Sequence, residues 1–175
     1  MKGGENLDKD ILEELYKKYY NTAYLYTLSL CKSKEQAEDI IADAFVKAFV
    51  SLNEATSFKY WLLVVCRNLW IDSLRKQKKL SKLPLEDIVL ESGDEELDYK
   101  LLLTERNHYI YTSISKLPET YKEVLILFYY GELSIAEISK LTKITPMNVK
   151  TLLHRGRKKL KEILEEKDHE FQRSL

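Results

Sequence analysis

Residues 133–160 combine two helix-start signals with a short turn, and this pattern constrains the fold more than any other part of the chain. Ser134 precedes Glu137 by three residues, the spacing of a capping box in which each residue satisfies a free backbone N–H group of the other. After a three-residue turn, Thr145 can cap a second helix with Pro146 at its first position, where a missing N–H group costs nothing. The segment therefore predicts a helix-turn-helix.

The second of these helices has an apolar face and a basic polar face. The residues expected to face the core at 3.6-residue spacing are Val149, Leu153, Gly156 and Leu160. The side chains expected to face outward are Met147, Asn148, Lys150, Thr151, His154, Arg155, Arg157 and Lys158. Such a helix is typical of a recognition helix that enters the DNA major groove, although an ordinary helical hairpin with a basic surface is the alternative.

The position of each outward side chain along this helix suggests what it would contact. Those near the N-terminus are expected to reach base edges: Asn148, Lys150 and Thr151. Those further along are expected to hold phosphates: Arg155, Arg157, Lys158 and Lys159.

The charges of the chain are segregated along the sequence. Its 28 Lys and Arg balance 28 Asp and Glu, and a net charge of zero would normally argue against nucleic acid as a partner. Residues 138–161, however, carry eight basic residues and no acid, and residues 59–82 carry seven against one acid. Residues 84–99 between them carry seven acids and no base. Two basic patches separated by an acidic stretch indicate nucleic-acid binding.

The fold class expected is all-α, with two small helical domains joined by a linker and the helix-turn-helix in the second. Five Gly, three Pro and long periodic segments favour helices over 7–33, 34–52 and 58–79. In the second of these, the apolar face consists of Ala37, Ile40, Ile41, Ala44, Phe45, Ala48, Phe49 and Leu52. The predicted domains are 1–80 and 109–175, with 81–108 as an acidic linker that includes a short helix near 97–103.

The second domain is expected to contain a helix that starts at Pro118 and stops at Gly131. Its core face would be formed by Val124, Leu125, Leu127 and Phe128.

Several function classes are not expected. The longest apolar run, residues 61–66, is far too short to cross a membrane, and the N-terminus lacks the apolar stretch of a secretory signal. The histidines, His108, His154 and His169, are far apart, and Cys31 and Cys66 stand alone, so we expect no metal site and a cytoplasmic location. Because the chain also lacks a glycine-rich phosphate loop and a nucleophile motif, we expect no enzymatic activity and no cofactor.

Two parts of the chain resemble a known family. Residues 117–160 (LPETYKEVLILFYYGELSIAEISKLTKITPMNVKTLLHRGRKKL) resemble the promoter-reading C-terminal domain of small sigma-70-type sigma factors, the extracytoplasmic-function group. Residues 37–49 (AEDIIADAFVKAF) and 57–79 (SFKYWLLVVCRNLWIDSLRKQKK) resemble the N-terminal domain of these factors. The resemblance covers about residues 10–80 and 110–165 in the right order, and two independent motifs make it specific.

The resemblance implies a sigma factor that binds core RNA polymerase and directs initiation at promoters by reading the minus-ten and minus-thirty-five elements. Contacts to the minus-thirty-five element would come from Pro146, Met147, Asn148, Lys150, Thr151, His154, Arg155, Arg157 and Lys158. Contacts to the minus-ten element would come from Asn53, Phe58, Lys59, Asn68, Arg75 and Lys76. Polymerase contacts would come from Glu38, Asp39, Asp43 and Phe45. The implied partners are core polymerase, promoter DNA and an anti-sigma factor, with no small-molecule substrate and no membrane insertion.

The chain departs from the family pattern at four positions. Ala42 stands where many relatives carry Gln in the polymerase-binding motif, and Ala55 where an aromatic residue often shapes the base pocket. Leu152 replaces a common Arg on the recognition helix. Lys143 replaces the usual turn glycine, so we expect a strained or altered turn there.

The competing interpretation is a two-domain transcription regulator that uses the helix-turn-helix without acting as a sigma subunit. Residues 1–80 lack the alternating strands and acidic cluster of a receiver domain and end in an aromatic and basic helix, which argues against it.

Overall fold

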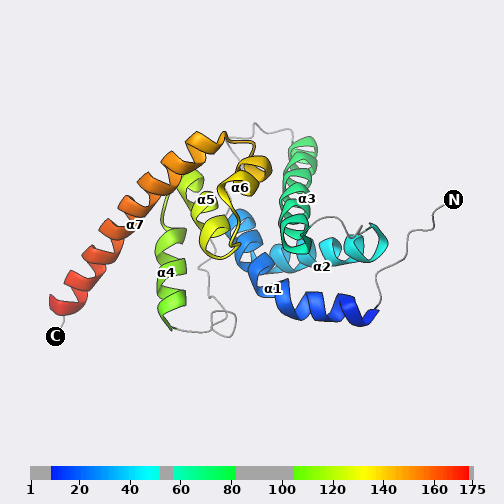
Figure 1. The fold of residues 1–175 in the computed structure, drawn as a ribbon, viewed down its shortest axis with the longest axis horizontal. Helices are drawn as coiled ribbons and strands as arrows, with labels where there is room; N and C mark the ends of the chain where they lie inside the picture. The colour runs from blue at the N-terminus through cyan, green and yellow to red at the C-terminus, as the bar shows by residue number, and fades with distance from the viewer. Residues whose placement is uncertain (1–8, 52–56, 82–104, 174–175) are drawn as a thin grey trace. The chain divides into compact units, whose positions relative to one another are not determined.

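The structure, a computed structural model, describes residues 9–51, 57–81 and 105–173. All regular structure in these ranges is helical (Figure 1). The helices are α1 Lys9–Cys31, α2 Lys34–Ser51, α3 Phe58–Ser81, α4 Glu105–Ser115, α5 Glu119–Tyr129, α6 Ile135–Thr142 and α7 Pro146–Arg173. The chain divides into two compact units, Met1–Glu95 and Glu96–Leu175, so the expectation of two all-α units is confirmed. The short helix predicted near 97–103 and most of the predicted linker lie outside the described residues.

In the first unit, α1, α2 and α3 pack against one another around one core. The apolar stripe of α2 supplies Ala37, Ala44 and Ala48, all fully buried, and these small side chains allow the neighbouring helices to approach closely. Leu62 and Leu63 of α3 are 1% exposed and fill the space beside them. Burial of such large apolar side chains is the main source of stability in a helical unit of this size.

An aromatic cluster covers one side of this core. The Phe58 ring at the start of α3 has its centroid 5.6 Å from that of Tyr19, 5.9 Å from that of Phe45 and 6.0 Å from that of Trp61. Tyr16 extends the cluster, with its centroid 4.8 Å from the Phe45 ring. Separations in this range are the ones at which aromatic pairs contribute beyond simple area burial. The cluster therefore fixes the start of α3 against α1 and α2.

The second unit is built around α5, which is packed by α4, α6 and α7. Residues 124–127 of α5 are fully buried, so Ile126 is a core position that the sequence pattern does not predict, whereas Phe128, predicted for the core face, is only half-buried. Gly156 of α7 crosses α5 closely, since a Cβ atom there would lie 3.1 Å from Leu125 Cδ1. The core face predicted for α7, from Val149 to Leu160, is confirmed by the burial of all four residues.

The helix-turn-helix has the predicted caps. The Ser134 hydroxyl accepts the backbone N–H of Glu137 at 3.2 Å, and the Glu137 carboxylate accepts the Ser134 N–H at 2.8 Å, which completes the capping box. At the second helix, the Thr145 hydroxyl accepts the Asn148 N–H at 3.3 Å. The turn residue Lys143 is left-handed, with φ 61° and ψ 26°. The strained turn expected at that position is therefore confirmed.

The end of α5 differs from a simple glycine stop. The N–H groups of Tyr130 and Gly131 both donate to the Ile126 carbonyl, and the left-handed residue is Glu132, with φ 50°. Gly131 is needed for space, because a Cβ atom there would lie 2.6 Å from the Leu127 carbonyl oxygen. Close approach of backbone, not a positive φ, is the physical reason for glycine at this position.

Candidate nucleic-acid and polymerase interfaces

The outer face of α7 is a continuous exposed surface that follows a well-fixed turn. All eight side chains predicted to face outward are exposed, and Pro146 is exposed as well. Met147, at 77% exposure, is among the most exposed apolar side chains of the described residues. The Thr151 hydroxyl donates to the Met147 carbonyl at 3.0 Å, which leaves its oxygen lone pairs for an outside donor. The capping box and the Thr145 cap hold this face at the surface of the second unit.

Arg157 is held by aromatic side chains of α5 more firmly than its position on a helix surface suggests. Its Nε–H donates to the Tyr129 hydroxyl oxygen at 2.9 Å. Its guanidinium carbon lies 4.9 Å from the Phe128 ring centroid and 5.7 Å from the Tyr129 ring centroid. The helix pattern could not reveal this arrangement, because Phe128 and Tyr129 are 29 and 28 residues away in the sequence.

The residues assigned to the minus-ten element are distributed unevenly over α3. Asn68, Arg75 and Lys76 are exposed, whereas Phe58 and Lys59 are half-buried at the start of the helix. Phe58 belongs to the aromatic cluster described above. Asn53 and Ala55 lie outside the described residues. The exposed members of this set therefore lie from the middle of α3 towards its C-terminus.

The residues assigned to polymerase binding lie partly on the surface and partly in the core. Glu38, Asp39 and Asp43 of α2 are exposed, but Phe45 is only 6% exposed. Phe45 therefore does not lie on the exposed surface with the three acids, because its ring packs against Tyr16 and Phe58. Phe49 differs in the opposite sense: the apolar pattern predicts a core residue, yet its side chain is 40% exposed.

An apolar strip that was not predicted from the sequence lies on the exposed side of α2. Val46, Phe49 and Val50 are all exposed there, with Val50 71% exposed. Val46 and Val50 are apolar residues outside the predicted core stripe, and this mismatch with the helical pattern was the signal that could have found them. Together with Asp39 and Asp43, the strip gives α2 a mixed acidic and apolar outer surface.

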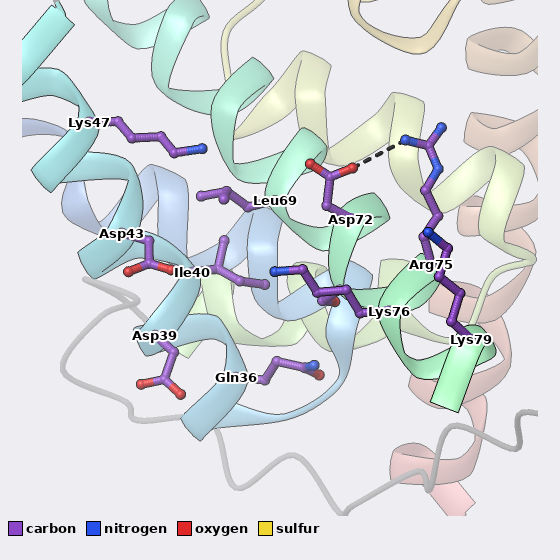
Figure 2. A pocket seen from close by; sticks show the side chains of 11 residues that line it. Gln36, Asp39, Ile40, Asp43, Lys47, Leu69, Asp72, Arg75, Lys76 and Lys79 are labelled. Carbon is purple, nitrogen blue, oxygen red and sulfur yellow. Dashed lines mark hydrogen bonds and ion pairs between the residues drawn. The ribbon is translucent and has the colours of Figure 1, made fainter. Parts of the chain in front are cut away.

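A groove of about 560 Å³ between α2 and α3 brings two of the predicted sites together. Figure 2 shows Asp39 and Asp43 on the α2 side and Arg75 and Lys76 on the α3 side. An Arg75 Nη atom pairs with the Asp72 carboxylate at 3.1 Å, and both side chains are mostly exposed. Water screens such a pair strongly, so Arg75 remains available to another anion. The acids assigned to polymerase and the bases assigned to DNA therefore line opposite walls of one groove.

Within the described residues, no group of three or more His, Cys, Asp or Glu side chains could hold a metal ion. Both cysteines are buried, and burial raises the pKa of the Cys66 thiol to about 11. A thiol in such surroundings is a packing residue rather than a nucleophile. None of the described helices is both long enough and apolar enough to cross a bilayer.

Comparison with known proteins agrees with the two-unit organisation. A family model described as sigma-70 region 2 matches residues 15–80, and one described as sigma-70 region 4 matches residues 107–160. The ECF RNA polymerase sigma factor SigM of Bacillus subtilis (strain 168) is 32% identical over 159 residues, which cover 86% of this chain and 93% of SigM. SigW of the same organism is 31% identical over 169 residues, 90% of each chain.

A solved structure shows the same fold. The sigma factor RpoE in its complex with the anti-sigma factor NepR from Bartonella quintana gives a TM-score of 0.68 at 20% identity, covering 90% of this chain and 98% of RpoE. The sequence matches span both units in the order expected of a two-domain factor. The chain therefore belongs to the extracytoplasmic-function group of the sigma-70 family, and it is a sigma factor that directs RNA polymerase to promoters.

Proposed function

We propose that this factor divides its work among three helices: α2 binds core RNA polymerase, α3 reads the minus-ten element and α7 reads the minus-thirty-five element. The observation that carries the proposal is the exposed, basic outer face of α7, held in place by a capped three-residue turn. Residues 1–80 would form the polymerase and minus-ten domain, residues 81–108 the linker, and residues 109–175 the minus-thirty-five domain.

In the minus-thirty-five domain, Asn148, Lys150 and Thr151 are proposed to read bases. They are exposed on the first turns of α7, and the N-terminal part of a recognition helix is the part that enters the major groove. Pro146, Met147 and His154 would complete the surface against the groove, and the remaining phosphate contacts would come from Arg155, Arg157 and Lys158.

The base-reading role can be tested by transcription in vitro. Asn148→Ala and Lys150→Ala should weaken use of a promoter with its minus-thirty-five element, yet leave binding to core polymerase intact. Lys116→Ala, an exposed residue between α4 and α5, is the matched control and should change neither property. Equal losses on a promoter with a scrambled minus-thirty-five element would mean that these side chains hold only phosphates.

The polymerase-binding surface is proposed to combine Glu38, Asp39 and Asp43 with the neighbouring strip of Val46, Phe49 and Val50. An interface of this kind gains area from apolar contacts and orientation from charges at its rim. Asp39→Arg should abolish co-purification with core polymerase, and Phe49→Ser should weaken it. Glu14→Arg, which reverses an exposed acid of α1, is the control. Unchanged co-purification of Asp39→Arg would refute the acidic assignment.

For the minus-ten element, we propose contacts from Asn68, Arg75 and Lys76. Their exposure supports binding to a strand that separates from its partner, because an amide can recognise an extruded base and cations can follow the backbone. Phe58 and Lys59 would act from the edge of this surface. Asn68→Ala should reduce open-complex formation on duplex promoters but have less effect on a pre-melted promoter.

An anti-sigma factor is proposed as a further partner. One solved structure that resembles this chain is such a complex, the sigma factor RpoE with the anti-sigma factor NepR, and another is CnrH in complex with the cytosolic domain of CnrY. We also propose that the factor acts in the cytoplasm, where the polymerase works, and that it has no catalytic activity of its own, no cofactor, no small-molecule substrate and no insertion into the membrane. Co-elution with core polymerase without DNA distinguishes this proposal from a helix-turn-helix regulator that binds DNA alone.

A further inference from the structure

We propose that Phe128 and Tyr129 of α5 are positioning residues that hold Arg157 as a preformed clamp for one phosphate of the promoter backbone. The inference rests on the proposed contact between α7 and the minus-thirty-five element. It adds two residues of another helix to that contact, and it separates Arg157 from the other cations on the α7 surface.

The geometry leaves most of the guanidinium free for a ligand. An arginine has five N–H donors, and the bond to the Tyr129 hydroxyl at 2.9 Å uses only the Nε–H. The four Nη–H donors remain, on a side chain that is exposed overall. The Phe128 ring, 4.9 Å from the guanidinium carbon, attracts the cation without consuming a donor. A planar group with paired Nη donors suits a phosphate, which it can bind through two hydrogen bonds.

Tyr129 orients the guanidinium. Its oxygen accepts the Arg157 Nε–H, which sets the direction of the guanidinium relative to α5. Its side chain is 46% exposed, so the pair is accessible from solvent. Tyr129 therefore affects phosphate binding through Arg157, whose Nη–H donors make the contact.

The position of Arg157 on α7 agrees with a backbone contact. Lys150, His154, Arg157 and Lys161 recur at steps of four, three and four residues, so they share one side of the helix. This basic stripe begins beside the proposed base-reading residues and runs towards the C-terminal part of α7. Arg155 and Lys159 lie on the other side of the helix. A helix in the major groove has one DNA strand on each side, so Arg157 would bind the strand facing α5.

Holding the arginine in advance has a direct energetic benefit. A free arginine side chain loses rotamer freedom when it binds a phosphate, and that loss weakens binding. Arg157 has already lost much of this freedom through its contacts with α5. Lys158 and Lys159, on the same helix, have no comparable contact to an aromatic ring among the interactions found in the described residues.

The test measures binding of the holoenzyme to a promoter duplex at several KCl concentrations, over a range of roughly 50 to 200 mM. Four variants are compared: Arg157→Gln, Tyr129→Phe, the double variant, and Lys116→Gln as a matched loss of one exposed charge. Arg157→Gln should weaken binding about tenfold and reduce the slope of log affinity against log salt by about 0.9. Tyr129→Phe should weaken binding about fivefold with the slope unchanged, because the charge remains.

The double variant should bind no more weakly than Arg157→Gln alone, because Tyr129 acts through Arg157. Lys116→Gln should change neither affinity nor slope. An unchanged slope for Arg157→Gln would overturn the clamp and leave Arg157 as a packing residue. Additive effects of the two substitutions would overturn the positioning role of Tyr129. If Arg157→Gln fails to fold, Arg157→Lys replaces it: about fivefold weaker binding at the same slope supports the clamp, and wild-type affinity overturns it.

Wild-type holoenzyme serves to separate this inference from the function on which it depends. If the wild-type factor does not select a promoter at all, the proposed function fails. If it selects a promoter, but the slope of log affinity against log salt is the same in Arg157→Gln as in wild type, only the clamp fails.

Discussion

Replacing Lys143 by glycine should stabilise the second unit without touching its core. Lys143 connects α6 to α7 with φ 61° and ψ 26°, the left-handed region. In that region the Cβ atom of an L-residue crowds the following carbonyl oxygen, and glycine has no such atom. The turn is also supported by the Ser139 hydroxyl, which donates to the Ile144 carbonyl at 2.6 Å. The surrounding contacts therefore hold Lys143 in this strained conformation.

The expected gain follows from two opposing contributions. The left-handed conformation costs an ordinary residue about 1–2 kcal/mol. Glycine removes that cost but gives the unfolded chain more freedom, which opposes folding by about 0.5–1 kcal/mol. The free energy of unfolding of the second unit should thus rise by about 0.5–1 kcal/mol in Lys143→Gly. Lys143→Ala is the matched control, because it removes the same charge and keeps the Cβ atom.

The assay must report on the second unit alone. Both tryptophans, Trp61 and Trp70, lie in the first unit. Tryptophan fluorescence therefore does not report on unfolding of the second unit, which contains the turn at Lys143. Native-state hydrogen exchange at the backbone amides of the buried residues Leu141 and Leu153 does report on the stability of the second unit. Exchange there should slow by about two- to fivefold in Lys143→Gly. The urea transition monitored by tryptophan should stay unchanged, which provides an internal control.

Two results would refute this reasoning. Equal exchange rates in the glycine and alanine variants would show that the Cβ atom is not the source of strain. Faster exchange in Lys143→Gly would show that the side chain of Lys143 stabilises the turn more than its backbone conformation destabilises it.

Three further predictions concern packing, capping and pH. Gly156→Val should destabilise the second unit by about 1–3 kcal/mol, because even a Cβ atom there lies 3.1 Å from Leu125 Cδ1; slower exchange in α5 and α7 would contradict this. Ser134→Ala should cost about 1 kcal/mol in the same exchange measurement by removing the capping box, and no change would show that the cap is redundant. Because burial raises the pKa of Cys66 from 9.0 to about 11, the unfolded thiol ionises first as pH rises. The first unit should therefore keep its full stability below about pH 9 and lose part of it between about pH 9 and 11, in a urea transition followed by tryptophan; the same loss in Cys66→Ala would contradict the assignment.

The elements that were predicted correctly depend on local chemistry. The helix-turn-helix follows from Ser134, Glu137, Thr145 and Pro146, whose side chains or rings act on backbone groups within three or four residues. The core face of α7 follows from the helical repeat alone. The strained turn at Lys143 was also foreseeable, since a turn of this length requires a left-handed residue whatever the side chain is.

Errors and omissions arose where burial depends on other helices. Phe45 and Phe49 share the apolar stripe of α2, yet the first is buried under Tyr16 and Phe58 and the second is 40% exposed. Periodicity identifies the face of a helix but not how far its neighbours extend along it. Val46 differs, because it lies outside the predicted core stripe and its exposure agrees with the helical repeat.

The sequence by itself determined every described helix except α4, the caps of the helix-turn-helix, the face that α7 buries and the segregation of charge. These properties depend on backbone hydrogen bonds and spacing along one helix, so they can be read without knowledge of the neighbours. The tertiary structure alone decided that Phe45 is covered while Phe49 on the same stripe is exposed, that acids of α2 and bases of α3 share a groove, and that Arg157 rests on Phe128 and Tyr129. Each of these depends on contacts between side chains of different helices. The sequence of one helix does not specify which other helix packs against it.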